Sequence, residues 1–165
     1  MTLSGMLPVP GWGNSMKSIV YLAAPLTHPD VKVMRMRERL ATEAAAYLVA
    51  TEGLVVLSPL TSTCPISRAM HELYGVKDDS HMAFLSQDFW VNKFDRKLLE
   101  ACNTLAILCL EGWEDSVGIK TEIEIARCND IEIVHLFPIF HYRHIAHLRW
   151  TEPFTEMDMC QVKEK

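Results

Sequence analysis

Four short apolar runs along the chain predict buried strands. They are "IVYLAAP" from residue 19, "LVVLSP" from residue 54, "TLAILCL" from residue 104 and "IEIVHLF" from residue 131. Continuous apolar runs of this length are typical of strands that are buried on both faces of a parallel sheet. Proline closes the first two runs, and it favours the end of a strand at that point.

The segments between these runs carry apolar residues at helical spacing and predict helices. In residues 31–52, Leu40, Ala44 and Leu48 recur on one face, and Gly53 follows where a helix C-terminal cap is expected. Further helices are predicted over residues 83–103 and 117–129 by the same spacing. Residues 60–82 lack a clear period, and we expect an irregular insertion there with one short helix and a polar loop that lines the site.

The alternation of strand and helix predicts an α/β fold. We expect a three-layer, largely parallel Rossmann-like (flavodoxin-like) sheet with helices on both faces. The α/β domain would span residues 19–137, between a flexible tail over residues 1–18 and an extension over residues 138–165 that covers a sheet edge or reaches a partner subunit. In such sheets ligands bind beyond the carboxyl ends of the strands, so the segments after the apolar runs are the candidate site.

Composition and charge narrow the classes of function. The 165 residues suit one domain, and the net charge of −5 comes with scattered lysines and arginines. The "RMRER" cluster at residues 35–39 is too short for the basic footprint that nucleic acid requires, and we expect it on a solvated helix face. We therefore expect no polymeric nucleic acid partner.

Cysteine usage and hydropathy indicate the cellular setting. The five cysteines are odd in number and form no CxxC pair, and the opening residues lack the pattern of a secretory leader. The longest apolar run is far shorter than the roughly 20 residues of a membrane span. We expect a cytoplasmic protein without a membrane helix.

Glu122 is the acidic residue with the least ordinary position. On the predicted helix over residues 117–129, Lys120, Glu124 and Arg127 share one face and can pair in solvent. Glu122 lies about 200° around the helix from Glu124 and points inward or along the site. The positive helix N-terminus is expected to keep it ionised, which suits a nucleophile or an electrostatic stabiliser. Alternatively, it pairs with a buried arginine or caps a loop.

Acid–base chemistry needs a second carboxyl group. Asp88 and Asp95 lie seven residues apart, on one face of the predicted helix over residues 83–103, and are the candidates. The alternative is that both are solvated residues of an amphipathic helix.

Two other groupings suggest chemistry less strongly. His141, His144 and His147 repeat every third residue, as metal ligands sometimes do, but beside aromatic residues we expect packing or partner contacts instead of a metal site. Cys64 and His71 offer a thiol and an imidazole, but no third group supports a nucleophile pair.

Several motifs in one order carry a resemblance. "YLAAPLTHPD", "VVLSPLT", "DRKLLEACNTLAIL" and "SVGIKTEIEIA" resemble the nucleoside 2-deoxyribosyltransferase superfamily over roughly residues 17 to 136. Within it, "HPD" after the first strand and "GWEDSVGI" before the last helix are most similar to an uncharacterised bacterial and phage group. Three departures stand out: Ala24 replaces a glycine, Thr27 and His28 stand where related hydrolases have a phosphate-binding arginine, and Asn103 replaces a structural aspartate.

The resemblance implies roles for individual residues. Glu122 would be the nucleophile, Asp95 would position the sugar or the nucleophile, and Asp88 would protonate the leaving base. Ser116 would donate to a 5′-hydroxyl or 5′-phosphate, and Gly118 would let the ligand approach the backbone. The remaining implied substrate-binding residues are Tyr21, Pro25, His28, Ser58, Trp90 and Trp113.

The expected function is cleavage or transfer at the N-glycosidic bond of a deoxynucleoside or deoxynucleotide. Glu122 would attack the anomeric carbon and form a glycosyl-enzyme, which water or a second base would resolve, by the logic of retaining glycosidases. No metal or other cofactor is expected, and the resemblance implies a homo-oligomer. The alternatives are a nucleotide-binding or signal-sensing module without catalysis, and a structural protein whose tail assembles an oligomer.

Overall fold

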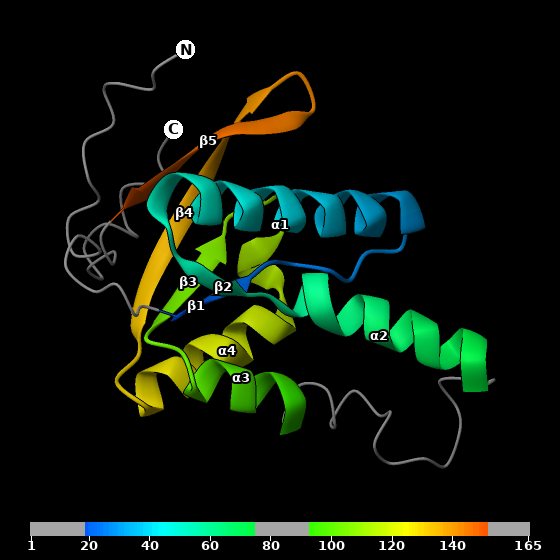
Figure 1. The fold of residues 1–165 in the computed structure, drawn as a ribbon, viewed down its shortest axis with the longest axis horizontal. Helices are drawn as coiled ribbons and strands as arrows, with labels where there is room; N and C mark the ends of the chain where they lie inside the picture. Colours follow the sequence, from blue (N-terminus) through cyan, green and yellow to red (C-terminus); the bar gives the residue numbers. More distant parts are fainter. Residues whose placement is uncertain (1–18, 75–92, 152–165) are drawn as a thin grey trace.

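The computed structural model describes residues 19–74 and 93–151. They form an α/β unit with a five-stranded sheet in the order β2-β1-β3-β4-β5 (Figure 1). The strands are β1 (Ile19–Ala23), β2 (Val55–Leu57), β3 (Thr104–Leu108), β4 (Glu132–His141) and β5 (His144–Thr151). The first four are parallel, and β5 pairs antiparallel with β4. The prediction of an α/β fold with a largely parallel sheet is confirmed.

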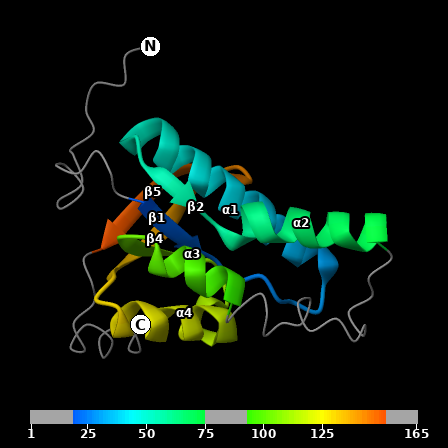
Figure 2. The same ribbon diagram turned by 60° about the horizontal axis from the view of Figure 1, so that its bottom comes forward.

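Four helices of the described residues pack against this sheet. They are α1 (Val31–Glu52), α2 (Pro59–Tyr74), α3 (Arg96–Glu100) and α4 (Val117–Cys128), with a 3₁₀ turn, η3 (Trp113–Asp115), before α4. In both views α1 lies on one side of the sheet and α3 and α4 lie on the other (Figures 1 and 2). Asp30 caps the start of α1 through Lys32 N–H, and Gly53 ends the helix with a φ of 67°.

The period-2 alternation along β1 divides the core into two parts. Val20 and Leu22 pack with the apolar face of α1, whereas Tyr21 and Ala23 pack with α3 and α4. Tyr21 is therefore fully buried on the α4 side of the sheet. This placement sets up the candidate site.

The prediction of an irregular insertion after β2 was wrong for its first part. Residues 59–74 form one continuous helix, α2, which contains Pro65. Pro59 is the first helical residue, where its fixed φ favours a helix and no N–H is needed. The internal Pro65 hid this helix, because proline within a run usually ends or kinks a helix. The rest of the expected insertion and the first part of the helix predicted over residues 83–103 lie outside the described residues.

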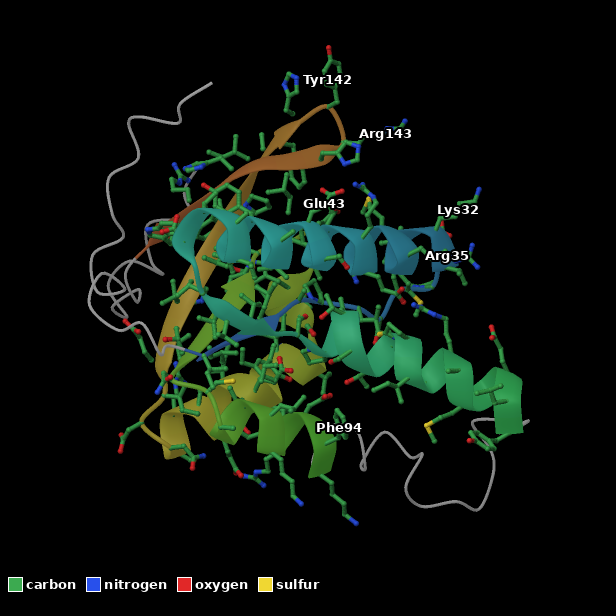
Figure 3. All side chains as sticks on the ribbon, in the orientation of Figure 1. Lys32, Arg35, Glu43, Phe94, Tyr142 and Arg143 are labelled. Carbon is green, nitrogen blue, oxygen red and sulfur yellow. The ribbon has the colours of Figure 1, made fainter. Side chains whose placement is uncertain are left out.

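The β4–β5 hairpin packs against α1. Glu43 of α1 receives hydrogen bonds from His144 Nδ1 at 2.7 Å and from Ile145 N–H at 3.0 Å. Tyr47 Oη lies 2.5 Å from His147 Nδ1. Figure 3 shows Glu43 facing the hairpin. Two of the three repeated histidines, His144 and His147, therefore contact α1.

Two findings concern the described ranges only. In residues 19–74 and 93–151, no three His, Cys, Asp or Glu side chains are grouped so as to hold a metal ion. In the same ranges, no helix is both long and apolar enough to cross a membrane.

Candidate active site

The centre of the candidate site is a hydrogen bond between β1 and α4. The Tyr21 hydroxyl donates to Glu122 Oε1 at 2.7 Å, across 101 residues of sequence. Ser116 caps α4 by accepting Ile119 N–H at 3.4 Å, which places Glu122 in the second helical turn. A phenol from the buried face of a strand therefore meets a carboxyl group on the helix that covers that face.

The expectation that the helix dipole keeps Glu122 ionised was wrong. Burial, opposed by the hydrogen bond from Tyr21 and assisted by the charge of Asp95, raises the pKa of Glu122 to about 7. The dipole acts mainly within the first turn of a helix, and Glu122 lies in the second. A carboxyl group with this pKa exists in both protonation states near neutral pH.

Asp95 is the second carboxyl group of the site. It stands at the N-cap position of α3 without capping it, and its Oδ1 accepts a hydrogen bond from Thr63 Oγ1 at 3.2 Å. Burial raises the pKa of Asp95 to about 6, although the bond from Thr63 acts in the opposite direction. Asp95 and Glu122 are close enough for the charge of Asp95 to raise the pKa of Glu122.

Thr63 is a site residue that sequence reasoning missed. It comes from α2, which was not recognised as a helix, and it is buried. Only the "TST" at residues 61–63, directly after an apolar strand, hinted at side-chain hydroxyls in this position.

Tyr21 keeps its proton at neutral pH. Burial and the nearby charges of Glu122 and Asp95 raise the pKa of the Tyr21 phenol well above its usual value. A permanent hydrogen-bond donor therefore faces a carboxyl group that titrates near neutrality. This arrangement stabilises the carboxylate without neutralising it.

The loops after β1 and β2 contribute three of the predicted residues. Pro25 and Ser58 are almost completely buried, and the hydroxyl of Ser58 has no hydrogen-bond partner within residues 19–74 and 93–151. His28 is partly buried, and its Nδ1 accepts the N–H of Asp30 at 3.0 Å.

The loop after β3 and the first turn of α4 contribute Trp113, Ser116 and Gly118. Trp113 is partly buried, packs against the core on the α4 side and meets the ring of His135 edge to face at 5.2 Å. Gly118 has an ordinary backbone conformation, and a Cβ added there would meet only Ser116 Oγ, at 3.9 Å. The described part of the protein therefore does not itself require glycine at this position.

The remaining predicted groups have mixed outcomes. Asp88 and Trp90 lie outside the described residues. Asn103 has the expected structural role, because its Oδ1 accepts Ile19 N–H at 3.0 Å where β1 and β3 begin. Burial raises the pKa of the Cys64 thiol to about 11, which disfavours the thiolate that a nucleophile needs; the side chain of His71 is not described.

The expectation that the basic cluster is entirely solvated was wrong for Arg37. Arg37 is only 7% exposed, because it precedes Leu40 by three residues and Ala44 by seven and so lies on the buried face of α1. Its guanidinium donates to the carbonyls of Thr27 at 2.8 Å and Glu111 at 2.7 Å. Helical spacing alone was enough to single out this residue.

Comparison with known proteins gives a family but no activity. No curated protein shows significant similarity to the chain. Residues 18–137 match the model of the family described as Domain of unknown function (DUF1937), and the chain belongs to that family.

Proposed function

We propose that this protein is an enzyme that breaks the N-glycosidic bond of 2′-deoxynucleosides or their 5′-monophosphates, as a 2-deoxyribosyltransferase or an N-hydrolase. The observation that carries the proposal is the Tyr21–Glu122 hydrogen bond of 2.7 Å with Asp95 nearby. Buried carboxyl groups with raised pKa values, near the carboxyl ends of parallel strands, are typical of catalytic sites. The resemblance to the nucleoside 2-deoxyribosyltransferase superfamily supplies the substrate class.

In the proposed first step, a Glu122 oxygen attacks the anomeric carbon of the sugar. The bond from that carbon to the base nitrogen breaks, and the base leaves with the electron pair and takes a proton from an acid. Asp88 is the proposed acid, and Asp95 positions the sugar or the nucleophile. Tyr21 stabilises the carboxylate form that attacks.

In the second step, water or an acceptor base attacks the same carbon, gives its proton to the Asp88 carboxylate that the first step leaves, and releases Glu122 as a carboxylate. The nucleophile and the acid of a retaining glycosidase stand about 5 Å apart. These steps balance without a metal or redox cofactor. The substrate-binding residues that the resemblance implies remain proposals, and those in the described ranges are Tyr21, Pro25, His28, Ser58, Trp113, Ser116 and Gly118.

The test compares the wild type with Glu122→Gln and with Glu124→Gln, a control on the same helix at an exposed position. Each protein is incubated with the four deoxynucleosides and their 5′-monophosphates, with and without an acceptor base, and free base is followed by chromatography. We expect base release or exchange by the wild type and the control, and a loss of at least about a hundredfold in Glu122→Gln.

Two results would contradict this proposal. If Glu122→Gln turns over substrate as fast as the wild type does, Glu122 is not the nucleophile. If no protein turns over any compound while nucleotides still raise its melting temperature, the alternative of a binding or sensing module without catalysis replaces the enzyme.

Three further expectations remain proposals. The strand order supports a three-layer, flavodoxin-like Rossmann arrangement, which an experimental structure would test. A homo-oligomer is proposed from the resemblance, and light scattering on the purified protein would reveal a monomer if this is wrong. A cytoplasmic location is proposed from cysteine usage, and cell fractionation tests it.

A further inference from the structure

Arg37 connects two loops that are far apart in the sequence. Its Nη1 donates to the carbonyls of Thr27 at 2.8 Å and Leu26 at 3.4 Å, in the loop after β1. Its Nη2 donates to the carbonyl of Glu111 at 2.7 Å, in the loop after β3. The guanidinium of one helical residue thus joins the carboxyl ends of two neighbouring strands.

The environment of this residue is unusual for a surface helix. A buried guanidinium is costly unless its donors are used, and here three backbone carbonyls accept from it. Its planar fork presents Nη1 and Nη2 in fixed directions. The carbonyls of the two loops can both accept hydrogen bonds from this rigid group only if the loops lie at a fixed distance from each other.

Gly112 is fitted to the same contact. It has a φ of +81°, in the left-handed region that favours glycine. A Cβ at this position would lie 3.2 Å from Arg37 Nη2. The loop after β3 is therefore shaped both by its own backbone and by the guanidinium packed against it.

Both loops lead directly to candidate site residues. The first contains His28, directly after the Thr27 carbonyl that Arg37 holds. The second runs from Glu111 to Ser116, the N-cap of α4, and α4 carries Glu122. A shift of either loop would move groups that the proposed reaction uses.

We propose that Arg37 is a positioning residue that sets the spacing between the loops after β1 and β3 and so organises the substrate site. Its catalytic consequence rests on the proposed function, but the bridge between the loops does not. It acts through hydrogen bonds to the backbone carbonyls of both loops.

The experiment uses the full chain with Arg37→Met, Arg37→Lys and the control Arg35→Met. Arg35 is exposed and lies near the start of the same helix (Figure 3). Peptide-resolved hydrogen–deuterium exchange is measured without ligand. In Arg37→Met we expect faster exchange at residues 24–30 and 110–116 together, by about tenfold or more, with β1, β3 and the C-terminal half of α4 unchanged.

Arg37→Lys separates the bridge from the charge. Lysine keeps the charge but has one ammonium group instead of a fork, so we expect at least one of the two loops to stay unprotected. The proposal is overturned if Arg37→Lys protects both loops as the wild type does, if Arg37→Met accelerates neither, or if Arg35→Met has the same effect.

Kinetics then tests positioning against simple support of the fold. With a substrate that the wild type turns over, we expect KM to rise at least about fivefold in Arg37→Met, while the pH midpoint of activity stays where Glu122 sets it. If only kcat falls, in proportion to the fraction of misfolded protein, Arg37 does not position the loops. If the pH midpoint of activity shifts, Arg37 acts on Glu122 through its charge instead. If no substrate is found, the proposed function fails and the exchange experiment still decides the bridge.

Discussion

At the scale of single residues, the site depends on one hydrogen bond between groups that are individually costly to bury. The Tyr21 hydroxyl would lack a strong acceptor without Glu122, and the Glu122 carboxylate would lack its donor without Tyr21. Their combination leaves Glu122 with a pKa near 7, between the values expected for full exposure and for burial without a donor. Each residue therefore sets the chemistry of the other.

The first prediction concerns this bond. Tyr21→Phe removes a donor that lowers the pKa of Glu122, so that pKa should rise and the carboxylate should become scarcer at neutral pH. We expect base release at pH 7 to fall by about tenfold or more, with the midpoint of the pH–rate profile displaced to higher pH. The control is Tyr47→Phe, which removes the hydroxyl that links α1 to His147 of the hairpin. An unmoved midpoint in Tyr21→Phe would show that the bond does not tune Glu122.

The second prediction concerns Gly118. Alanine fits the described surroundings of this position and is a better helix former than glycine. Gly118→Ala should therefore raise the free energy of unfolding, by up to about 1 kcal/mol in urea denaturation. If the glycine leaves room for a ligand, the same variant should raise KM or weaken nucleotide binding severalfold. A stabilised variant with unchanged KM and binding would exclude close approach of the ligand there.

At the scale of elements, the first four strands and two of the helices follow from local pattern. The apolar runs predicted β1 to β4, although only β1 and β3 are buried along nearly their whole length, and Val55 in the edge strand β2 is exposed. The cap at Gly53 and the apolar spacing predicted α1. In α4, the sequence also predicted that Glu122 points away from the solvated face of Glu124, because helical geometry fixes the angle between the two residues.

Elements that proline interrupts were not predictable in this way. Helix α2 begins with Pro59 and contains Pro65, and proline within a run disfavours a helix. Its contacts stabilise it: Arg68 pairs with Glu38 of α1, with Nη1 2.7 Å from Oε2, and Thr63 donates to Asp95. Similarly, β4 extends past Pro138 because β5 pairs with it from His135 to His141, with an irregularity between Ile139 and Phe140.

At the scale of the whole molecule, the buried carboxyl groups oppose folding at higher pH. The folded-state pKa of Glu122 is about 7, above its ordinary value of 4.5, so the folded protein binds more protons than the unfolded chain between these values. The contribution of Glu122 to stability is therefore fully present below pH 4.5, and it is lost as the pH rises through 7. Asp95 acts with the same sign, between 3.8 and about 6.

The third prediction follows from this linkage. Glu122→Gln keeps an oxygen that accepts from Tyr21 but cannot ionise, so it should remove the loss of stability that Glu122 causes. We expect the variant to be more stable than the wild type at pH 8, by on the order of 2–3 kcal/mol, and nearly equal at pH 4.5. Urea unfolding of both proteins across this range measures the difference. Parallel stability curves for the two proteins would mean that Glu122 titrates normally in the folded state.

The sequence by itself determined the α/β class, the parallel strands and the inward placement of Glu122. These are properties of local periodicity and of positions next to strand ends, which short-range geometry fixes. Only the tertiary structure decided that Tyr21 meets Glu122, that Thr63 meets Asp95 and that Arg37 joins two loops. Each of these contacts spans between 10 and 101 residues. Burial, which raises the pKa values of both carboxyl groups, likewise depends on all the elements packed around them and not on any local pattern.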